Sequence, residues 1–221
     1  MPRRALLDKR PWLLASIIAA FAFYLLADGE WATLELALLK AAALASLAVY
    51  AFQRHQSIDA ALLALVMALG ALGDFGMEFD VTLGGAAFLL GHLIAIALYL
   101  RNRRKTPSIS QKILGVALLV SVPLIAWLLT AAIEVALYAT ALGAMAAAAW
   151  TSRFPRYRVG IGAVLFAVSD LVIFARMGGQ IEPELASWLV WPIYYVGQFL
   201  ICTGVIQSLR GQISGVNTRP A

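Results

Sequence analysis

A carboxylate lies in the middle of an apolar run that is otherwise long enough to cross a membrane. Asp170 stands within residues 160–175, where nearly every other residue is apolar. An ionised side chain at the centre of a bilayer costs roughly 2.5–3.5 kcal/mol on insertion scales, and such residues mark substrate, ion or proton sites. A purely structural role is therefore the weaker explanation of Asp170.

Four other predicted helices carry polar side chains of kinds that catalyse reactions or bind ligands. The rise per residue places Lys40 and His92 about 13–15 Å below the outer ends of their helices, close to the middle of the membrane. Asp74 lies near the outer end of its helix, with Glu78 one turn beyond it. Ser169 shares a helix face with Asp170, and Tyr194, Tyr195 and Gln198 share a face of the last helix. Together they predict a polar cavity that contains water and opens toward the outer leaflet.

Most of these residues also have a purely structural explanation. Lys40 can extend its ammonium group toward the outer surface without any further role. Asp74 can end a helix at the interface, where terminal backbone groups need polar partners. Taken singly, three others can each be explained by hydrogen bonding between helices, namely His92, Tyr194 and Gln198. Their occurrence together, at similar depths, favours a functional cavity over a set of unrelated contacts.

The composition is that of an integral membrane protein. Of the 221 residues, 62% are hydrophobic and 13% are charged, against about 45–50% and about 25% in soluble domains. We therefore expect a single integral membrane domain over residues 1–221. One cysteine, Cys202, excludes an internal disulfide, and two histidines exclude a histidine-rich metal centre. We expect no metal and no cofactor. We also expect no nucleic-acid partner, because the basic residues lie in short loops between spans, as a membrane topology signal does.

The fold class is predicted to be all-α, a polytopic bundle of eight transmembrane helices. A span needs about 20 apolar residues, and the candidates lie at 11–27, 31–52, 58–74, 82–100, 111–129, 132–150, 159–176 and 185–208. All but two of the 17 Lys and Arg residues fall on one side, the exceptions being Lys40 and Arg176. The positive-inside rule then places both termini in the cytoplasm, and we expect a bacterial inner membrane. Glu134 and Tyr138 are typical of residues at the membrane interface.

Short motifs recur in order along these helices. Gly73-Asp74 ends the third, Phe88 and His92 follow at a spacing of four, and the last contains Tyr194-Tyr195-Val196-Gly197-Gln198. The seventh contributes Gly162-Ala163, Phe166 and Ser169-Asp170. This combination resembles the YhhN-type lysoplasmalogenase family of eight-helix membrane proteins, from Lys40 to Gln207. The chain departs from the family pattern at Ala41, Ala95 and Gly197, which bears on the substrate range more than on the fold.

The resemblance implies hydrolysis of the vinyl ether bond of a lysoplasmalogen, a lysophospholipid. The products would be a fatty aldehyde and glycerophosphoethanolamine or glycerophosphocholine. Such a reaction needs an acid that protonates the vinyl carbon, a carboxylate that stabilises the resulting cation, and a bound water molecule. Desolvation disfavours an ionised Asp170, which makes it the candidate acid. Asp74, expected nearer to water, is the candidate carboxylate or base, and His92 is the alternative base.

The other candidates would bind the substrate. Tyr194, Tyr195 and Gln198 would position the water molecule or the ether oxygen, with Ser169 beside Asp170. Lys40 would bind the lipid phosphate and Glu78 an amine head group. The alkenyl chain would lie among the helices, which suits a lipid that enters from the membrane.

Three other classes of protein are compatible with buried charges. A small-molecule or proton-coupled transporter also places charges near the midplane, but transporters commonly contain inverted repeats, and none is evident here. A retinal-type photoreceptor would use Lys40 as a Schiff base and Asp170 as its counter-ion. A lipid-binding protein without catalysis would need the cavity but not the carboxylates. Release of aldehyde from a lysoplasmalogen would distinguish the hydrolase from all three.

Overall fold

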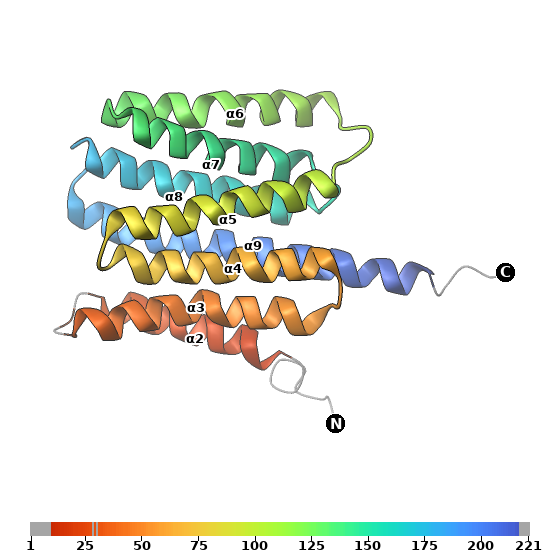
Figure 1. Cartoon of the computed structure of the whole chain (residues 1–221), viewed down its shortest axis with the longest axis horizontal. Coiled ribbons are helices and arrows are strands. Elements are labelled where there is room, and N and C mark those ends of the chain that lie inside the picture. Colours follow the sequence, from red (N-terminus) through yellow and green to blue (C-terminus); the bar gives the residue numbers. More distant parts are fainter. Residues whose placement is uncertain (1–9, 28, 30, 217–221) are drawn as a thin grey trace. The chain divides into compact units, whose positions relative to one another are not determined.

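The computed structural model describes residues 10–27, 29 and 31–216, with side chains up to Gly211. Some charges used above lie outside the described residues, namely Arg3, Arg4, Lys9, Asp28, Glu30 and Arg219. In the described part the chain is helical throughout, with eight α-helices and one π-helical turn (Figure 1). The elements are α2 (Pro11–Leu26), α3 (Thr33–Arg54), α4 (Ile58–Met77), α5 (Val81–Arg101), α6 (Ile109–Thr130), α7 (Ile133–Thr151), η1 (Arg156–Gly160), α8 (Ile161–Met177) and α9 (Pro183–Val216).

Seven of the described helices are long and apolar enough to cross a membrane, and they include α3 to α7 and α9. The seventh consists of η1 and α8 together, over Arg156–Met177. The prediction of an all-helical membrane protein is therefore confirmed. Helix α2 is apolar but has only 16 residues, about 24 Å at 1.5 Å per residue, which is shorter than a hydrocarbon core of about 30 Å. Eight spans remain a prediction.

Helix α9 is the element whose length differs most from the predicted one. It has 34 residues and continues to Val216, whereas the apolar pattern ends at residue 208. The pattern marks where the side chains cease to be apolar, but a helix can continue into water with polar residues because its backbone hydrogen bonds are internal. The apolar pattern therefore located the helix but predicted its end too early.

The chain divides into two compact units, with the division inside α5 between Ile94 and Ala95. In the first unit, α2 packs against α3 and α3 packs against α4. In the second unit, α6 packs against α7, α8 packs against α9, and both α6 and α7 contact α8. Each unit contains one of the two candidate carboxylates.

Helices α4 and α5 form a close hairpin in the first unit. A Cβ atom on Gly76 would lie 3.0 Å from Gly84, and one on Gly73 would lie 2.8 Å from the ring of Phe88. Such close approach is typical of small residues at membrane helix interfaces. Because Asp74 follows Gly73 and His92 is one turn beyond Phe88, this register fixes how far apart the two lie along the hairpin.

Asp80 starts α5 after the tight turn of this hairpin. Its Oδ1 accepts hydrogen bonds from the backbone N–H groups of Thr82 at 2.7 Å and Leu83 at 3.0 Å, the arrangement of a helix N-cap. The backbone N–H groups of Leu83 and Thr82 hold the pKa of Asp80 below its usual value. Asp80 therefore has a structural role at the turn of the hairpin.

Helices α8 and α9 approach through two glycines in the second unit. A Cβ atom on Gly162 would lie 2.6 Å from the carbonyl oxygen of Gly197 and 2.9 Å from Ile201 Cγ1. Farther along, the rings of Phe166 and Tyr194 make an edge contact with centroids 5.2 Å apart. The glycine contact therefore sets the register that brings the aromatic residues of α9 beside the turn of α8 that ends at Asp170.

We expect Gly162→Ala to destabilise the protein. The added methyl group meets a backbone carbonyl that cannot move without shifting α9, and overpacking of this kind costs typically about 1–3 kcal/mol. Thermal unfolding in detergent is the measurement, with a lower midpoint as the expected result. Gly85→Ala is the matched control, because a Cβ atom there meets nothing within 4 Å. Equal midpoints for the two variants would contradict the proposed importance of the glycine contact.

Candidate active site

The first unit holds an ion pair between two candidate residues. Lys40 Nζ lies 2.7 Å from Glu78 Oε1, and the side chains are 19% and 29% exposed. The ammonium group also lies 5.5 Å from the ring centroid of Phe23 on α2. The sequence predicted separate roles for these two charges, and the structure pairs them with each other. A ligand that binds either charge must therefore share it or replace its partner.

Asp74 and His92 are buried in the same unit. Their exposed fractions are 3% and 2%, and Asp74 precedes Glu78 by one turn of α4, about 6 Å along the helix. Asp74 was expected to be nearer to water than Asp170, which is 7% exposed. The exposed fractions do not decide this expectation, which stays a prediction, although the end of the helix was predicted too early because α4 continues to Met77. Exposure therefore does not assign the acid and base roles.

The second unit surrounds Asp170 with hydroxyl groups. Tyr138 on α7 donates a hydrogen bond to Asp170 Oδ2 at 3.0 Å. Ser169 Oγ lies 3.5 Å from Asp170 Oδ1 and donates its proton to the carbonyl oxygen of Phe166 at 2.7 Å. The hydroxyl group of Ser169 has one proton, so its lone pairs remain available toward Asp170. This arrangement suits a neutral carboxyl group that donates from Oδ1 and accepts at Oδ2.

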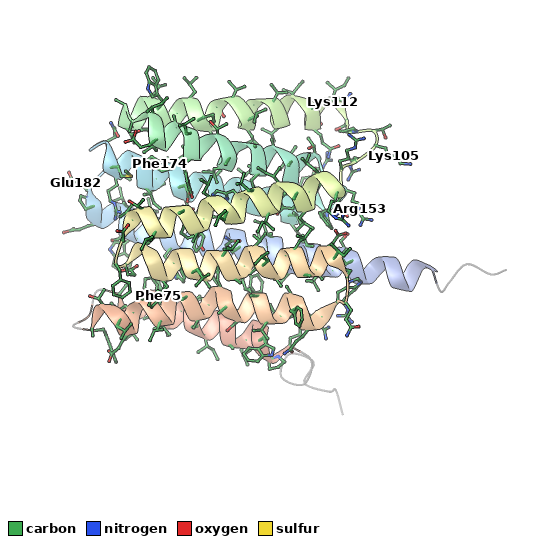
Figure 2. The ribbon with its side chains drawn as sticks, in the orientation of Figure 1. Phe75, Lys105, Lys112, Arg153, Phe174 and Glu182 are labelled. Carbon is green, nitrogen blue, oxygen red and sulfur yellow. The ribbon has the colours of Figure 1, made fainter. Side chains whose placement is uncertain are left out.

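Tyr138 is the site residue that sequence reasoning missed. Its distance from the start of α7 indicated a residue at the membrane interface, and the structure corrects this by placing its hydroxyl group on Asp170. Its ring makes an edge contact with Phe174, which Figure 2 labels. Leu142 and Met145 share its helix face and are both buried, so this face points to the protein interior. The sequence carried no clear signal of it, because apolar residues occupy every face of α7.

An aromatic cluster on α9 lies beside the same turn of α8. Trp191 is 5.7 Å from Tyr194 and 6.0 Å from Tyr195 between ring centroids, and the latter pair is stacked. All three side chains are at most 8% exposed. The predicted stripe of Trp191, Tyr194 and Tyr195 is therefore an interior face, and it adjoins Asp170 through Phe166.

Gln198 and Asp170 lie at different levels along the helices of the second unit. Gln198 follows Gly197, which meets Gly162, and Asp170 is eight residues farther along α8, or about 12 Å. Gln198 is 1% exposed, and among the described residues its Oε1 atom has no hydrogen-bond partner. Buried acceptors are usually satisfied by protein or ordered water. Gln198 can therefore accept a hydrogen bond from water or a hydroxyl group.

The candidate residues thus form two sets, one in each unit. The first consists of Lys40, Asp74, Glu78 and His92, and the second of Ser169, Asp170, Tyr194, Tyr195 and Gln198, to which the structure adds Tyr138. Each set provides a buried carboxylate with further polar groups nearby. That the sets share one cavity remains a prediction.

The chemistry of these sets can be compared with that of known proteins. The model of the YhhN family matches residues 36–205, a segment that contains every candidate residue. A search of curated proteins and a search of solved structures find no match. The matched segment covers more than half of the 221 residues, and with the buried carboxylates and apolar helices just described it shows that the chain belongs to the YhhN family, which is the lysoplasmalogenase family.

Proposed function

We propose that the protein is a lysoplasmalogenase, a membrane hydrolase that cleaves the vinyl ether bond of lysoplasmalogens. The products are a fatty aldehyde and glycerophosphoethanolamine or glycerophosphocholine. The observation that carries the proposal is that the carboxyl group of Asp170 is buried in an apolar helix and accepts a hydrogen bond from Tyr138. Membership of the YhhN family supports the same reaction.

The proposed reaction begins with protonation of the vinyl ether. A proton moves to the β-carbon, and the ether oxygen shares the positive charge with the α-carbon as an oxocarbenium ion. Water adds to the α-carbon and loses a proton to a base, which gives a hemiacetal. The hemiacetal then releases the aldehyde while the glycerol oxygen leaves as a hydroxyl group. One water molecule is consumed, and the catalytic acid regains its proton.

Asp170 is proposed as the general acid. A neutral carboxyl group there would accept from Tyr138 at Oδ2 and would hold its proton on Oδ1, which lies 3.5 Å from Ser169 Oγ. Asp74 and His92 are the two candidates for the base that takes the proton from water. Asp74, when ionised, would also stabilise the oxocarbenium ion. Tyr194 and Tyr195 would position the water molecule or the ether oxygen. Gln198 lies about 12 Å from Asp170 along the helix axis, so its Oε1 atom would bind water or a hydroxyl group at a distance from the acid.

Lys40 and Glu78 are proposed to bind the head group. A zwitterionic head group carries one phosphate and one ammonium group. It can therefore replace the ion pair between Lys40 and Glu78 by two others, phosphate with Lys40 and ammonium with Glu78. The glycerol unit that joins the phosphate to the vinyl ether is short. Glu78 lies one turn from Asp74, so a head group bound by Glu78 would lie close to the candidate carboxylate.

We expect Lys40→Met and Glu78→Gln each to raise KM for lysoplasmenyl-ethanolamine about tenfold, because hydrogen bonds to charged groups contribute about 1.5–3 kcal/mol. The turnover number should change little, since neither group acts on the vinyl ether. Steady-state kinetics separate the two parameters. Lys112→Met, a charge loss at an exposed position of α6, is the matched control. A lower turnover number at unchanged KM would argue against head-group binding.

The decisive experiment measures aldehyde release from lysoplasmenyl-ethanolamine by the purified protein. The saturated alkyl ether analogue is the control, because it has no double bond to protonate. In water labelled with oxygen-18 no label should enter the released glycerol hydroxyl group, since water attacks the α-carbon and the bond between the glycerol carbon and its oxygen stays intact. No aldehyde release would refute the hydrolase. Transport of the lipid across a liposome without any product would instead favour a transporter.

We also propose that α2 completes a set of eight spans, with both termini in the cytoplasm and the protein in a bacterial inner membrane. The support is the distribution of Lys and Arg residues, which gather on the side of the termini. Reporters fused at the N-terminus and at the C-terminus should both report the cytoplasm, and a reporter inserted at Gly29, after α2, should report the opposite side. A reporter at Gly29 on the same side as the N-terminus would refute the span of α2, and termini outside the cytoplasm would refute the orientation.

A further inference from the structure

One end of the second unit is uniformly basic. Three segments lie there, at residues 101–112, 151–158 and 207–211, and none of them contains Asp or Glu. They contain nine basic residues, namely Arg101, Arg103, Arg104, Lys105, Lys112, Arg153, Arg156, Arg158 and Arg210. Figure 2 shows Lys105, Lys112 and Arg153 at this end and Glu182 at the opposite end.

The loops at this end are joined by hydrogen bonds rather than simply adjacent. The α5–α6 loop and the segment after α7 form a β-bridge between Arg103 and Ser152. The backbone N–H of Arg153 donates to Asn102 O at 2.8 Å, and its Nε donates to Asn102 Oδ1 at 2.6 Å. The backbone N–H of Arg104 donates to Thr151 O at 3.3 Å. We refer to residues 102–104 and 151–153 as the joined loops.

The joined loops rest on a well-packed base. Asn102 is 3% exposed and donates from Nδ2 to Leu98 O at 2.9 Å. The rings of Tyr99 and Phe154 pack edge to face beneath, and both side chains are at most 1% exposed. Gln111 ties the start of α6 to Trp150 O at 3.2 Å. The backbone that carries the arginines is therefore held in one arrangement before any ligand binds.

Arg103 and Arg104 present their guanidinium groups outward from this base. Both side chains are exposed. Arg104 uses only its Nε in a long contact with Ser152 O. Among the described residues no carboxylate pairs with either arginine. Topology explains why basic residues lie on this side of the membrane, but it does not require that loops from two helix pairs be joined beneath two arginines.

We infer that the joined loops bind the head group of an anionic phospholipid, with the phosphate held by Arg103 and Arg104. The planar guanidinium group matches two phosphate oxygens at once. Basic clusters next to membrane spans attract anionic lipids, and the attraction falls within a Debye length. The loops follow directly on α5 and α7, and Tyr157 beside them is 69% exposed. Exposed aromatic residues of this kind mark head-group depth, which favours a lipid over a soluble anion.

The test uses the full-length protein in detergent and titrates it with phosphatidylglycerol or with phosphatidylcholine of the same acyl chains. Native mass spectrometry counts the bound lipid. Wild-type protein should bind phosphatidylglycerol at least about tenfold more tightly than phosphatidylcholine, since each basic residue near the surface adds about 1 kcal/mol to the attraction. The preference should weaken as salt is added. Equal binding of the two lipids would overturn the inference.

Two double variants separate a specific site from a diffuse positive potential. Arg103→Gln with Arg104→Gln should weaken binding of phosphatidylglycerol about tenfold or more. Lys105→Gln with Lys112→Gln removes the same charge from the same end and should weaken it less than about threefold. Equal losses in the two double variants would overturn the site. If Arg103→Gln with Arg104→Gln fails to fold, Arg103→Lys with Arg104→Lys replaces it. Undiminished binding of phosphatidylglycerol by the lysine variant would refute phosphate recognition by the guanidinium groups.

A soluble ligand is tested with the same protein. Inorganic polyphosphate is added to protein that has bound phosphatidylglycerol. Displacement only at concentrations far above those of the lipid supports the inference. Polyphosphate that binds more tightly than the lipid would assign the joined loops to a soluble polyanion and would overturn it. Neither outcome depends on the hydrolase activity, because the readout is bound lipid.

Discussion

Asp170→Asn is expected to lower the turnover number for lysoplasmenyl-ethanolamine at least about 10²-fold, the low end for loss of acid–base catalysis. The amide has nearly the same shape as the carboxyl group and can still accept the hydrogen bond from Tyr138. It cannot protonate the vinyl ether. Initial rates of aldehyde release measure the effect, and thermal unfolding in detergent checks that the variant folds.

Tyr138→Phe is the matched comparison for that variant. It removes the hydrogen bond at 3.0 Å but leaves the carboxyl group and its proton in place. The turnover number should fall by about threefold to tenfold, in line with a net contribution of about 0.5–1.5 kcal/mol for one hydrogen bond. A loss as large as that of Asp170→Asn would mean that Tyr138 itself contacts the reacting atoms. Wild-type turnover in Asp170→Asn would remove this carboxyl group from the mechanism.

The helices could be predicted from the sequence because local chemistry marks both their middles and their ends. The α4–α5 hairpin is an example. Ser57 caps α4 by accepting from Ala60 N, Asp80 caps α5, and apolar runs of about 20 residues lie beyond each cap. Caps and apolar length act within a few residues of the chain, so a single sequence contains them.

The contacts of the site were harder to predict from the sequence, because they join residues that are distant in the chain. Lys40 and Glu78 are 38 residues apart, and nothing near either one shows that it pairs with the other. Tyr138 and Asp170 are 32 residues apart and belong to different helices. Depth along each helix could be computed from the rise per residue. Which faces turn toward each other depends on helix packing, which a single sequence does not contain.

Chemical type was therefore a better guide than position. Asp170 was identified because a carboxylate in an apolar span has few explanations. Tyr138 escaped because a tyrosine near a helix end has a common one.

Asp74→Asn alone should also lower kcat/KM at least about 10²-fold, by loss of the base or of the charge that stabilises the oxocarbenium ion. Combined with Asp170→Asn, the loss should fall well short of the product of the single losses, because residues that act as a unit in one step are strongly non-additive. A double-mutant cycle on kcat/KM, measured above the buffer rate, gives the coupling. Glu35→Gln, an exposed carboxylate of α3 in the same unit, should show no coupling to Asp170→Asn. Losses for Asp74 and Asp170 that simply multiply would place the two carboxylates in separate sites, and the prediction of one shared cavity would then fail.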